Sequence, residues 1–401
     1  MCAAIFVLAL AARLAAVTWA GWTSLSFGDA PAYLFAAREL VRTGQYPVAT
    51  EPFYFRAPGY PVFLAAVTLG RPDRVAVAKA ANAALGAAAA LLLVALSARI
   101  FRRRSLAIAT GIAAAVYPAL VSLSTDVASE PLFLVLLLSA GFLLLASADR
   151  PSSNLALLAG AATAAAALTR PSALVLVPLL AAPLFDRRHP PRVRWHIAGS
   201  ALVGFFLTLA PWTLRNALVF HELLPVNDAA GGAFYQGNSD WMVRFYEVRT
   251  PEEYAAWSRG MFADLERQTA ALAAAGRTSP KERSRYFFAK GIAERSGDPA
   301  GWARLLLKKA QDFARPYPNP LFWPRPVVLG VGAAGTAATL LAIFGLAVAR
   351  RGQVRNFALC VLAVSLAAHV ALIVVWRYRI PYWDPILLLY AAPGGARLLS
   401  R

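Results

Sequence analysis

The stretch VAVAKAANAALGAAAALLLVALSARIFRRRS, residues 75–105, is the part of the sequence that decides the fold. Residues 75–98 carry one charged side chain, Lys79, whereas the end of the stretch is a run of arginines. A helix of about 20 apolar residues suffices to cross a bilayer. Arginine and lysine collect in the loops on the cytoplasmic side of a membrane. This stretch therefore predicts a membrane-spanning helix over 75–98 whose carboxyl end faces the cytoplasm.

The composition of the whole chain is that of a membrane protein. Of the 401 residues, 59% are hydrophobic and 15% are charged, whereas soluble domains contain about 25% charged residues. The net charge of +19 does not indicate nucleic acid as a partner, because the basic residues lie in short loops between apolar segments. The two cysteines imply no disulfide framework, and the four histidines show no metal-ligand spacing.

Repetition of the same pattern along the chain predicts an all-α polytopic membrane protein with about ten transmembrane helices. The predicted spans lie near 2–21, 75–98, 105–123, 128–147, 153–168, 171–185, 196–217, 327–349, 355–376 and 381–398. A further apolar segment, 58–70, is too short to span a bilayer, and we interpret it as re-entrant or interfacial. The first span lacks the positive start of a signal peptide, so we interpret it as an anchor.

The distribution of arginine supports this count and gives an orientation. With a cytoplasmic N-terminus, the cytoplasmic segments are ARIFRRRS, ADRPSSN, DRRHPPRVRW, ARRGQVRN and the C-terminal RLLSR. Four of these five contain at least two arginines, as the positive-inside rule requires. The chain then divides into a transmembrane module at 1–217 with a first outward loop at 22–74, an outward region at 218–326, and C-terminal helices at 327–401. The region 218–326 has nearly balanced charges and helix-like stretches, and we expect it to fold outside the membrane.

Charged residues at the outward ends of the spans are the candidates for chemistry. Asp29 precedes Pro31 and a predicted amphipathic helix, so it is an N-cap, a general base at the membrane face, or both. Arg56, in YFRAPGYP, is either an interfacial arginine beside aromatic rings or a bidentate phosphate ligand. Asp126 and Glu130, in STDVASEP, are either caps of the next span or a second carboxylate facing Asp29.

Several arginines on the outward side run against the usual charge bias. Arg170 lies in the tight loop TRPS, and Arg377 and Arg379 lie in WRYRIPYWD, which we expect to be an outward loop. No Gly-rich nucleotide loop and no Ser-His-Asp arrangement is present. Carboxylates and arginines at a membrane surface suit a lipid phosphate as substrate, and a polyprenyl-phosphate sugar fits this description.

An ordered set of short motifs resembles a known family over nearly the whole chain. The first outward loop resembles that of bacterial glycosyltransferases of the C superfamily (GT-C), through the pieces GDAPAYLFAARELVRTGQYP and RAPGYPVFLA. Within the superfamily, the similar group is glycosyltransferase family 39, or dolichyl-phosphate-mannose-protein mannosyltransferase-like. This group includes the lipid A aminoarabinose transferase. Further similar pieces are SEPLFLVLLL, LTRPSALVLVPLL, PWTLRNALVF, GGAFYQGN and RYRIPYW. Ala30 follows Asp29 where eukaryotic relatives carry an Asp-Glu pair, so the resemblance does not support protein O-mannosylation.

The resemblance implies roles for individual residues. Asp29 and Glu130 stand at the family's catalytic acidic positions, and Arg56, Arg170 and Arg379 at positions that bind the donor phosphate or face outward. Two tyrosines in the same motifs, Tyr33 and Tyr60, and the arginine Arg377 are further candidates for binding substrate.

The expected reaction is transfer of a sugar from a polyprenyl-phosphate donor to a hydroxyl group of a glycan, lipid or protein acceptor, with inversion. Asp29 would remove the hydroxyl proton, and arginines would stabilise the leaving phosphate. The resemblance implies a bacterial inner membrane with the active site outward, and the distribution of arginine places both termini on the cytoplasmic side. We expect no cofactor and no nucleic-acid partner. One carboxylate pair without histidines does not support a dedicated metal site, and the sequence leaves the participation of a divalent cation open. The alternatives are a lipid-linked glycan transporter or flippase, a non-catalytic membrane subunit, and a glycan ligase or polymerase on the same scaffold.

Overall fold

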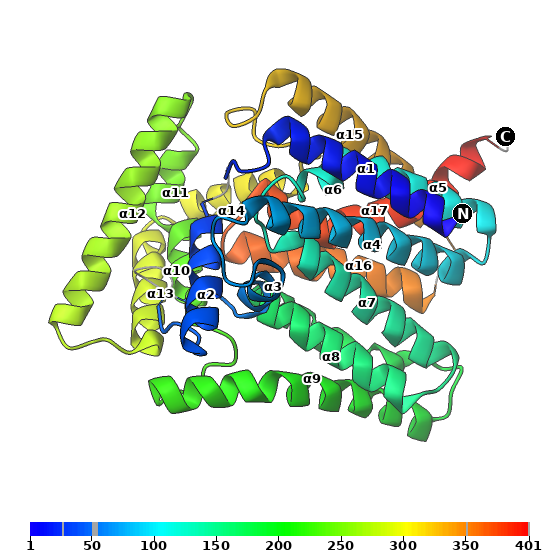
Figure 1. Ribbon diagram of the computed structural model, residues 1–401, viewed down its shortest axis with the longest axis horizontal. Helices are drawn as coiled ribbons and strands as arrows, with labels where there is room; N and C mark the ends of the chain where they lie inside the picture. The colour runs from blue at the N-terminus through cyan, green and yellow to red at the C-terminus, as the bar shows by residue number, and fades with distance from the viewer. Residues whose placement is uncertain (26–27, 50–54, 350–351, 400–401) are drawn as a thin grey trace.

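The computed structural model describes residues 1–25, 28–49, 55–349 and 352–399, and within these ranges the protein is helical with no β-strand. Most of the apolar helices lie roughly along the long axis of the molecule (Figure 1). The helices of this bundle are α1 Cys2–Ala20, α4 Val75–Phe101, α5 Arg104–Val116, α6 Pro118–Ser122, α7 Glu130–Asp149, α8 Ser153–Thr169, the 3₁₀ helix η1 Pro171–Phe185, α9 Pro191–Phe220, α15 Arg325–Val348, α16 Gln353–Ala371 and α17 Trp376–Leu399. Residues 26–27 and 50–54 of the predicted first outward loop, 350–351 of the loop ARRGQVRN, and 400–401 lie outside the described residues.

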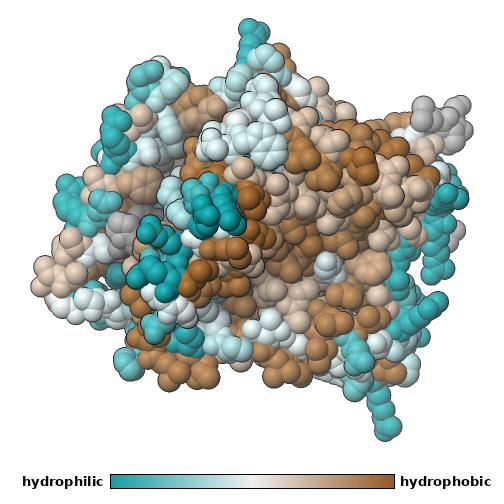
Figure 2. Space-filling model, viewed as in Figure 1, coloured by the Kyte–Doolittle hydropathy of each residue, from teal (hydrophilic) through white to brown (hydrophobic). Residues whose placement is uncertain are grey.

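The all-α membrane fold is confirmed, whereas the count of ten spans is not. Six described helices are long and apolar enough to cross a membrane: α1, α4, α7, α9, α15 and α16. Four more apolar helices, α3 Gly59–Thr68, α5, α8 and η1, have between 10 and 17 residues. On the face shown in Figure 2, hydrophobic residues cover the middle of the molecule and hydrophilic residues gather toward its two ends, as expected of a multi-pass protein.

The third predicted span, 105–123, is interrupted at Tyr117, which lies between the end of α5 at Val116 and the start of α6 at Pro118. Proline lacks the N–H that would bond to the carbonyl of Ala114. Arg13 of α1 donates instead to the carbonyl oxygens of Ala114 and Ala115, at 3.3 and 3.0 Å, and its side chain is fully buried. The arginine inside the first span therefore satisfies backbone groups that the proline leaves free.

The interpretation of WRYRIPYWD as a loop is wrong, because α17 begins at Trp376 and includes this motif. Three prolines, Pro381, Pro385 and Pro393, lie inside this helix. Proline usually ends a helix, so the sequence pattern favoured a later start. Arg377 and Arg379 consequently lie in the first turn of a helix.

The remaining helices lie at one end of the molecule. The amphipathic helix predicted after Asp29 is α2, Ala30–Thr43. The region 218–326 contains α10 Ala229–Asn238, α11 Asp240–Phe245, α12 Pro251–Ala274, α13 Pro280–Ser296 and α14 Pro299–Ala314. Figure 1 shows α12 and α13 projecting beyond the apolar helices at the left of the view. Tyr235, Met261, Leu265 and Phe287 form a small hydrophobic core within this region.

Small residues allow close packing among the apolar helices. Helices α8 and α9 pack together, and so do α15 and α17. A Cβ atom added to Gly160 of α8 would lie 1.8 Å from the carbonyl oxygen of Ala201, and one added to Gly204 of α9 would lie 2.0 Å from that of Leu157. Glycine at such contacts lets the backbones of membrane helices approach closely.

Candidate active site

Asp29 lies between two arginines that are distant in sequence. Arg56 donates from Nη2 to its Oδ1 at 2.9 Å, and Arg377 donates from Nη2 to its Oδ2. Asp29 occupies the N-cap position of α2, but its carboxylate makes no capping hydrogen bond. The N-cap interpretation is therefore wrong for the side chain, because both carboxylate oxygens are directed to guanidinium groups.

The ion pairs continue from Asp29 to the second carboxylate. Arg377 Nε lies 3.5 Å from Oε1 of Glu130, and Arg170 Nη1 lies 2.9 Å from the same oxygen. The side chain of Glu130 is 1% exposed and that of Arg170 is 13% exposed. Five residues thus form one continuous set of ion pairs, which we call the carboxylate–arginine cluster. Its members are Arg56, Asp29, Arg377, Glu130 and Arg170.

Helix ends bring the members of the cluster together. Asp29 directly precedes α2, Glu130 is the first residue of α7, and Arg170 precedes η1. Each of these helices has a proline in its first turn, and proline there fixes the start of a helix. The charged residues therefore lie at the starts of helices that meet at one end of the bundle.

The electrostatic balance of the cluster favours an anion. Three guanidinium groups face two carboxylates, so the fully ionised cluster has an excess of one positive charge. Burial alone would raise the pKa of Asp29, but the charges of Arg377, Arg56 and Arg170 together hold that pKa well below its usual range. Asp29 is consequently ionised at neutral pH.

The two candidate tyrosines pack beside the cluster. The guanidinium of Arg56 lies 5.4 Å from the ring centroid of Tyr33, which meets the ring of Tyr60 edge-on at 5.0 Å. The hydroxyl of Tyr60 accepts a hydrogen bond from Asn82 Nδ2 at 2.9 Å, and Asn82 also donates to the carbonyl oxygens of Asp126 and Ala128. Asn82 thereby fixes the loop that leads to Glu130.

Arg379 lies outside the cluster, contrary to the expectation that it joins the others. Its side chain is 1% exposed and forms an ion pair with Asp384 at 2.8 Å. Its Nη1 also donates to the carbonyl oxygens of Ala314 and Arg315, at the end of α14. A cation at a helix C-terminus is favourable, so this arginine joins α17 to α14.

The other acidic candidate near the cluster, Asp126, is also accounted for locally. It is buried, and its Oδ1 accepts a hydrogen bond from the backbone N–H of Val127 at 2.7 Å.

Sequence reasoning missed two residues that contact the cluster. Ser129 Oγ accepts hydrogen bonds from Arg170 at 2.9 Å and from the hydroxyl of Tyr33 at 3.3 Å. The ring of Tyr378 lies 4.7 Å from the guanidinium of Arg170. Both residues are adjacent in sequence to a predicted site residue, which is the signal that could have identified them. In the part of the chain that the structure describes, no three His, Cys, Asp or Glu side chains gather as metal ligands would.

Comparison with known proteins adds a family match over part of the chain. Residues 56–214 match the family model described as dolichyl-phosphate-mannose-protein mannosyltransferase. This range includes Arg56, Glu130 and Arg170 but neither Asp29 nor Arg377. No curated protein matches the chain.

The chain is similar to several solved structures at low sequence identity. The chain is similar to the archaeal oligosaccharyltransferase AglB from Archaeoglobus fulgidus in complex with an inhibitory peptide and a dolichol-phosphate, with a TM-score of 0.60 and 12% identity over 100% of this chain and 50% of that chain. The apo form of the A. fulgidus oligosaccharyltransferase gives a TM-score of 0.58 and 14% identity over 100% of this chain and 51% of that chain. ArnT from Cupriavidus metallidurans bound to undecaprenyl phosphate gives 0.44 and 16% identity over 98% of this chain and 78% of that chain.

The chain thus spans about half the length of the oligosaccharyltransferase structures that it matches. The structural similarity shows that the chain shares the helical membrane fold of these structures, and the family model matches residues 56–214 of it.

Proposed function

We propose that this protein transfers a sugar from a polyprenyl-phosphate donor to an acceptor hydroxyl group at the outward face of a bacterial inner membrane. The observation that carries this proposal is the position of Asp29 between Arg56 and Arg377, with Glu130 and Arg170 completing the cluster. A carboxylate can accept a proton, and guanidinium groups match phosphate oxygens in a bidentate geometry. The dolichol-phosphate bound to the similar archaeal enzyme supports a lipid phosphate as donor.

In the proposed reaction, Asp29 accepts the proton of the acceptor hydroxyl as its oxygen attacks the anomeric carbon. The bond between the anomeric carbon and the phosphate oxygen breaks, and its electron pair remains on the leaving polyprenyl phosphate. Arg56 and Arg377 stabilise the charge that develops on this phosphate. The transition state resembles an oxocarbenium ion, and attack from the face opposite to the phosphate inverts the anomeric centre.

The ion pairs suggest how the donor activates the base. A carboxylate held by two guanidinium groups is a weak base, because its pKa lies far below neutral pH. The donor phosphate carries a negative charge of its own and competes for the same guanidinium groups. When Arg56 and Arg377 turn to the phosphate, Asp29 loses its partners and gains a neighbouring negative charge, so its pKa rises. The base thus becomes effective only after the donor has bound.

Glu130 and Arg170 position the other components in this mechanism. Glu130 holds both Arg170 and Arg377, so it keeps Arg377 within reach of Asp29. Ser129 and Tyr33 contribute the neutral hydrogen-bonding groups beside Arg170. Arg379 has no role in donor binding here, because its guanidinium is paired with Asp384 and with the end of α14.

The decisive experiment is sugar transfer by the wild type and by Asp29→Asn in proteoliposomes, with a panel of labelled polyprenyl-phosphate sugars. We expect a loss of about 10²–10⁴-fold in the variant, which is the usual contribution of a general base. Asp73→Asn is the matched control, because Asp73 lies in the same half of the chain but pairs with Arg71 at the exposed surface. Equal transfer by Asp29→Asn would remove Asp29 from the mechanism, and no transfer by the wild type from any donor would contradict the donor class.

A further inference from the structure

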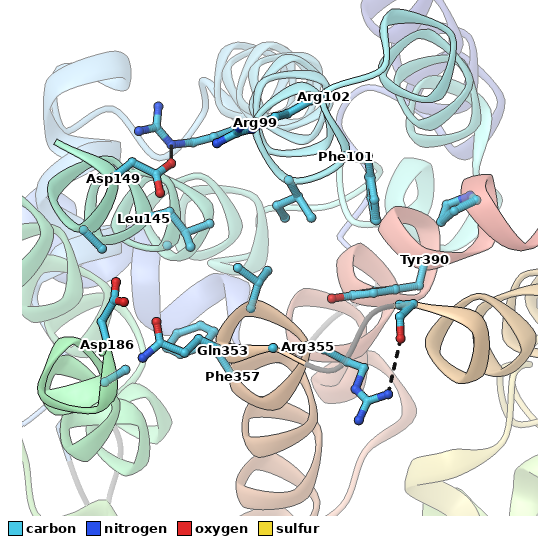
Figure 3. Close-up of a pocket in the computed structure, with 18 of the residues that line it drawn as sticks. Arg99, Phe101, Arg102, Leu145, Asp149, Asp186, Gln353, Arg355, Phe357 and Tyr390 are labelled. Carbon is cyan, nitrogen blue, oxygen red and sulfur yellow. Dashed lines mark hydrogen bonds and ion pairs between the residues drawn. The ribbon is translucent and has the colours of Figure 1, made fainter. Parts of the chain in front are cut away.

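A cavity lies at the other end of the bundle from the carboxylate–arginine cluster. The cavity has a volume of about 1230 Å³ and opens between α4, α7, α16, α17 and the end of η1 (Figure 3). Helix α7 begins at Glu130 in the cluster and ends at Asp149, which lines the cavity. A helix of 20 residues is roughly 30 Å long, so the two sites lie on opposite sides of the apolar helices.

Apolar side chains line the inner walls of the cavity. Leu145, Phe101 and Phe357 point toward the cavity, and the ring of Tyr390 meets that of Phe101 edge-on at 5.7 Å (Figure 3). Gly141 also lines the cavity, and a Cβ atom added there would meet no other heavy atom within 4 Å. Part of the cavity therefore lies beside Gly141, where α7 has no side chain to fill it. Its volume exceeds the roughly 300–1,000 Å³ of sites for drug-sized ligands.

The mouth of the cavity carries a large excess of positive charge. Seven arginines and two carboxylates, Asp149 and Asp186, are among the lining residues. The carboxylates are already engaged, because Asp149 pairs with Arg99 at 3.1 Å and Arg188 pairs with Asp149 and Asp186. Among the described residues, no ion pair to a carboxylate involves the three lining arginines Arg102, Arg103 and Arg187, which are all exposed.

We propose that this cavity binds an anionic phospholipid of the surrounding bilayer, with its head group at the mouth that Arg102, Arg103 and Arg187 line and an acyl chain against the apolar wall. Basic pockets between membrane helices bind anionic lipid head groups in this manner. An apolar chamber behind a basic mouth fits an amphiphile better than a free anion, which has no group to occupy the chamber. This site is separate from the proposed donor site, and its lipid is a stable partner of the protein and not a reactant.

Native mass spectrometry of the detergent-solubilised protein, titrated with phosphatidylglycerol or with phosphatidylcholine, tests the proposal. We expect the wild type to bind phosphatidylglycerol at least about tenfold more tightly than phosphatidylcholine. The double variant Arg103→Gln/Arg187→Gln should lose about tenfold in affinity for phosphatidylglycerol, since each basic residue near an anionic lipid contributes measurably. The control Arg259→Gln/Arg285→Gln removes the same charge from exposed positions on α12 and α13 and should bind like the wild type.

Two further binding measurements test whether the ligand is a lipid. Gly141→Phe keeps every arginine but fills part of the apolar chamber, so we expect it to weaken binding of phosphatidylglycerol by about tenfold. Glycerol phosphate, the head group without its chains, should fail to compete at the concentration that saturates with lipid. Equal affinity for the two phospholipids, unchanged affinity in the arginine variant, or full competition by glycerol phosphate would each overturn the proposal.

Discussion

At the scale of single residues, the state of Asp29 governs the proposed chemistry. Its carboxylate is ionised in the free protein because Arg377, Arg56 and Arg170 outweigh the effect of burial on its pKa. A base with so low a pKa removes a hydroxyl proton poorly. The donor phosphate can raise the pKa of Asp29, because it competes with this carboxylate for the same arginines.

This competition predicts different acidic limbs in the two pH profiles of sugar transfer. The limb of kcat/KM reports the free enzyme, where Asp29 protonates only well below the usual Asp pKa of about 3.9. The limb of kcat reports the enzyme–donor complex, where we expect the pKa of Asp29 to be at least about one unit higher. Steady-state rates, measured from pH 8 down to the lowest pH at which the protein stays folded, give both profiles, and we expect the fall in kcat to begin at a higher pH than the fall in kcat/KM. Coincident limbs would mean that Arg56 and Arg377 remain on Asp29 after the donor has bound.

The sequence predicted the members of the cluster better than their pairing. The excess of outward charges identified Asp29, Arg56, Glu130 and Arg170 as residues of one face. The resemblance gave Arg379 a family position and left Arg377 as a further candidate, and the interpretation of their motif as a loop provided no geometry to test that order. In the helix that the structure has there, residues two apart point in different directions, so Arg377 reaches Asp29 whereas Arg379 reaches Asp384.

At the scale of helices, backbone contact between α8 and α9 holds one side of the bundle. The sequence predicted both spans from their apolar content, but the alanine-rich pattern did not indicate which glycines lie between helices. Gly204 and Gly199 both belong to α9, yet a Cβ atom on Gly204 would lie 2.0 Å from the carbonyl oxygen of Leu157, whereas one on Gly199 would meet nothing within 4 Å. The position of the neighbouring helix distinguishes Gly204 from Gly199, and a single sequence does not contain that position.

These two glycines give a matched pair of variants. We expect Gly204→Ala to destabilise the protein by about 1–3 kcal/mol or more, because the helices must separate to admit the methyl group. Gly199→Ala should be neutral or stabilising by up to about 1 kcal/mol, because alanine is the better helix former. Thermal unfolding in detergent, followed by tryptophan fluorescence, measures the difference. Equal unfolding temperatures for the two variants would contradict the close contact.

At the scale of the whole molecule, Lys309 connects the region 218–326 to the apolar helices. Its side chain is fully buried on α14, and its Nζ donates to the carbonyl oxygens of Gly237 and Leu372, each at 2.9 Å. The sequence predicted helices in this region but not this junction, because Lys309 and the exposed Lys308 look alike in an amphipathic helix. Only the packing of α10, α14 and the end of α16 distinguishes them.

The burial of Lys309 predicts that stability depends on pH. Burial lowers the pKa of this lysine to about 7, whereas the unfolded chain keeps a pKa near about 10.4. Between these values the unfolded state binds more protons than the folded state, so the free energy of unfolding rises with pH, by at most about 1.4 kcal/mol per unit. Below pH 7 both states are protonated, and this dependence disappears.

Comparison of variants isolates this dependence from other titrating groups. We expect the wild type to gain stability over Lys309→Met as the pH rises from 7 to 9 in thermal unfolding experiments. Lys308→Met is the control, and it should follow the wild type at every pH because that lysine is exposed. A constant difference between wild type and Lys309→Met would mean that the carbonyl oxygens of Gly237 and Leu372 keep the ammonium charged. Lys309 would then be charged at every pH tested, and its hydrogen bonds to the two carbonyl oxygens would offset the free-energy cost of burying its charge.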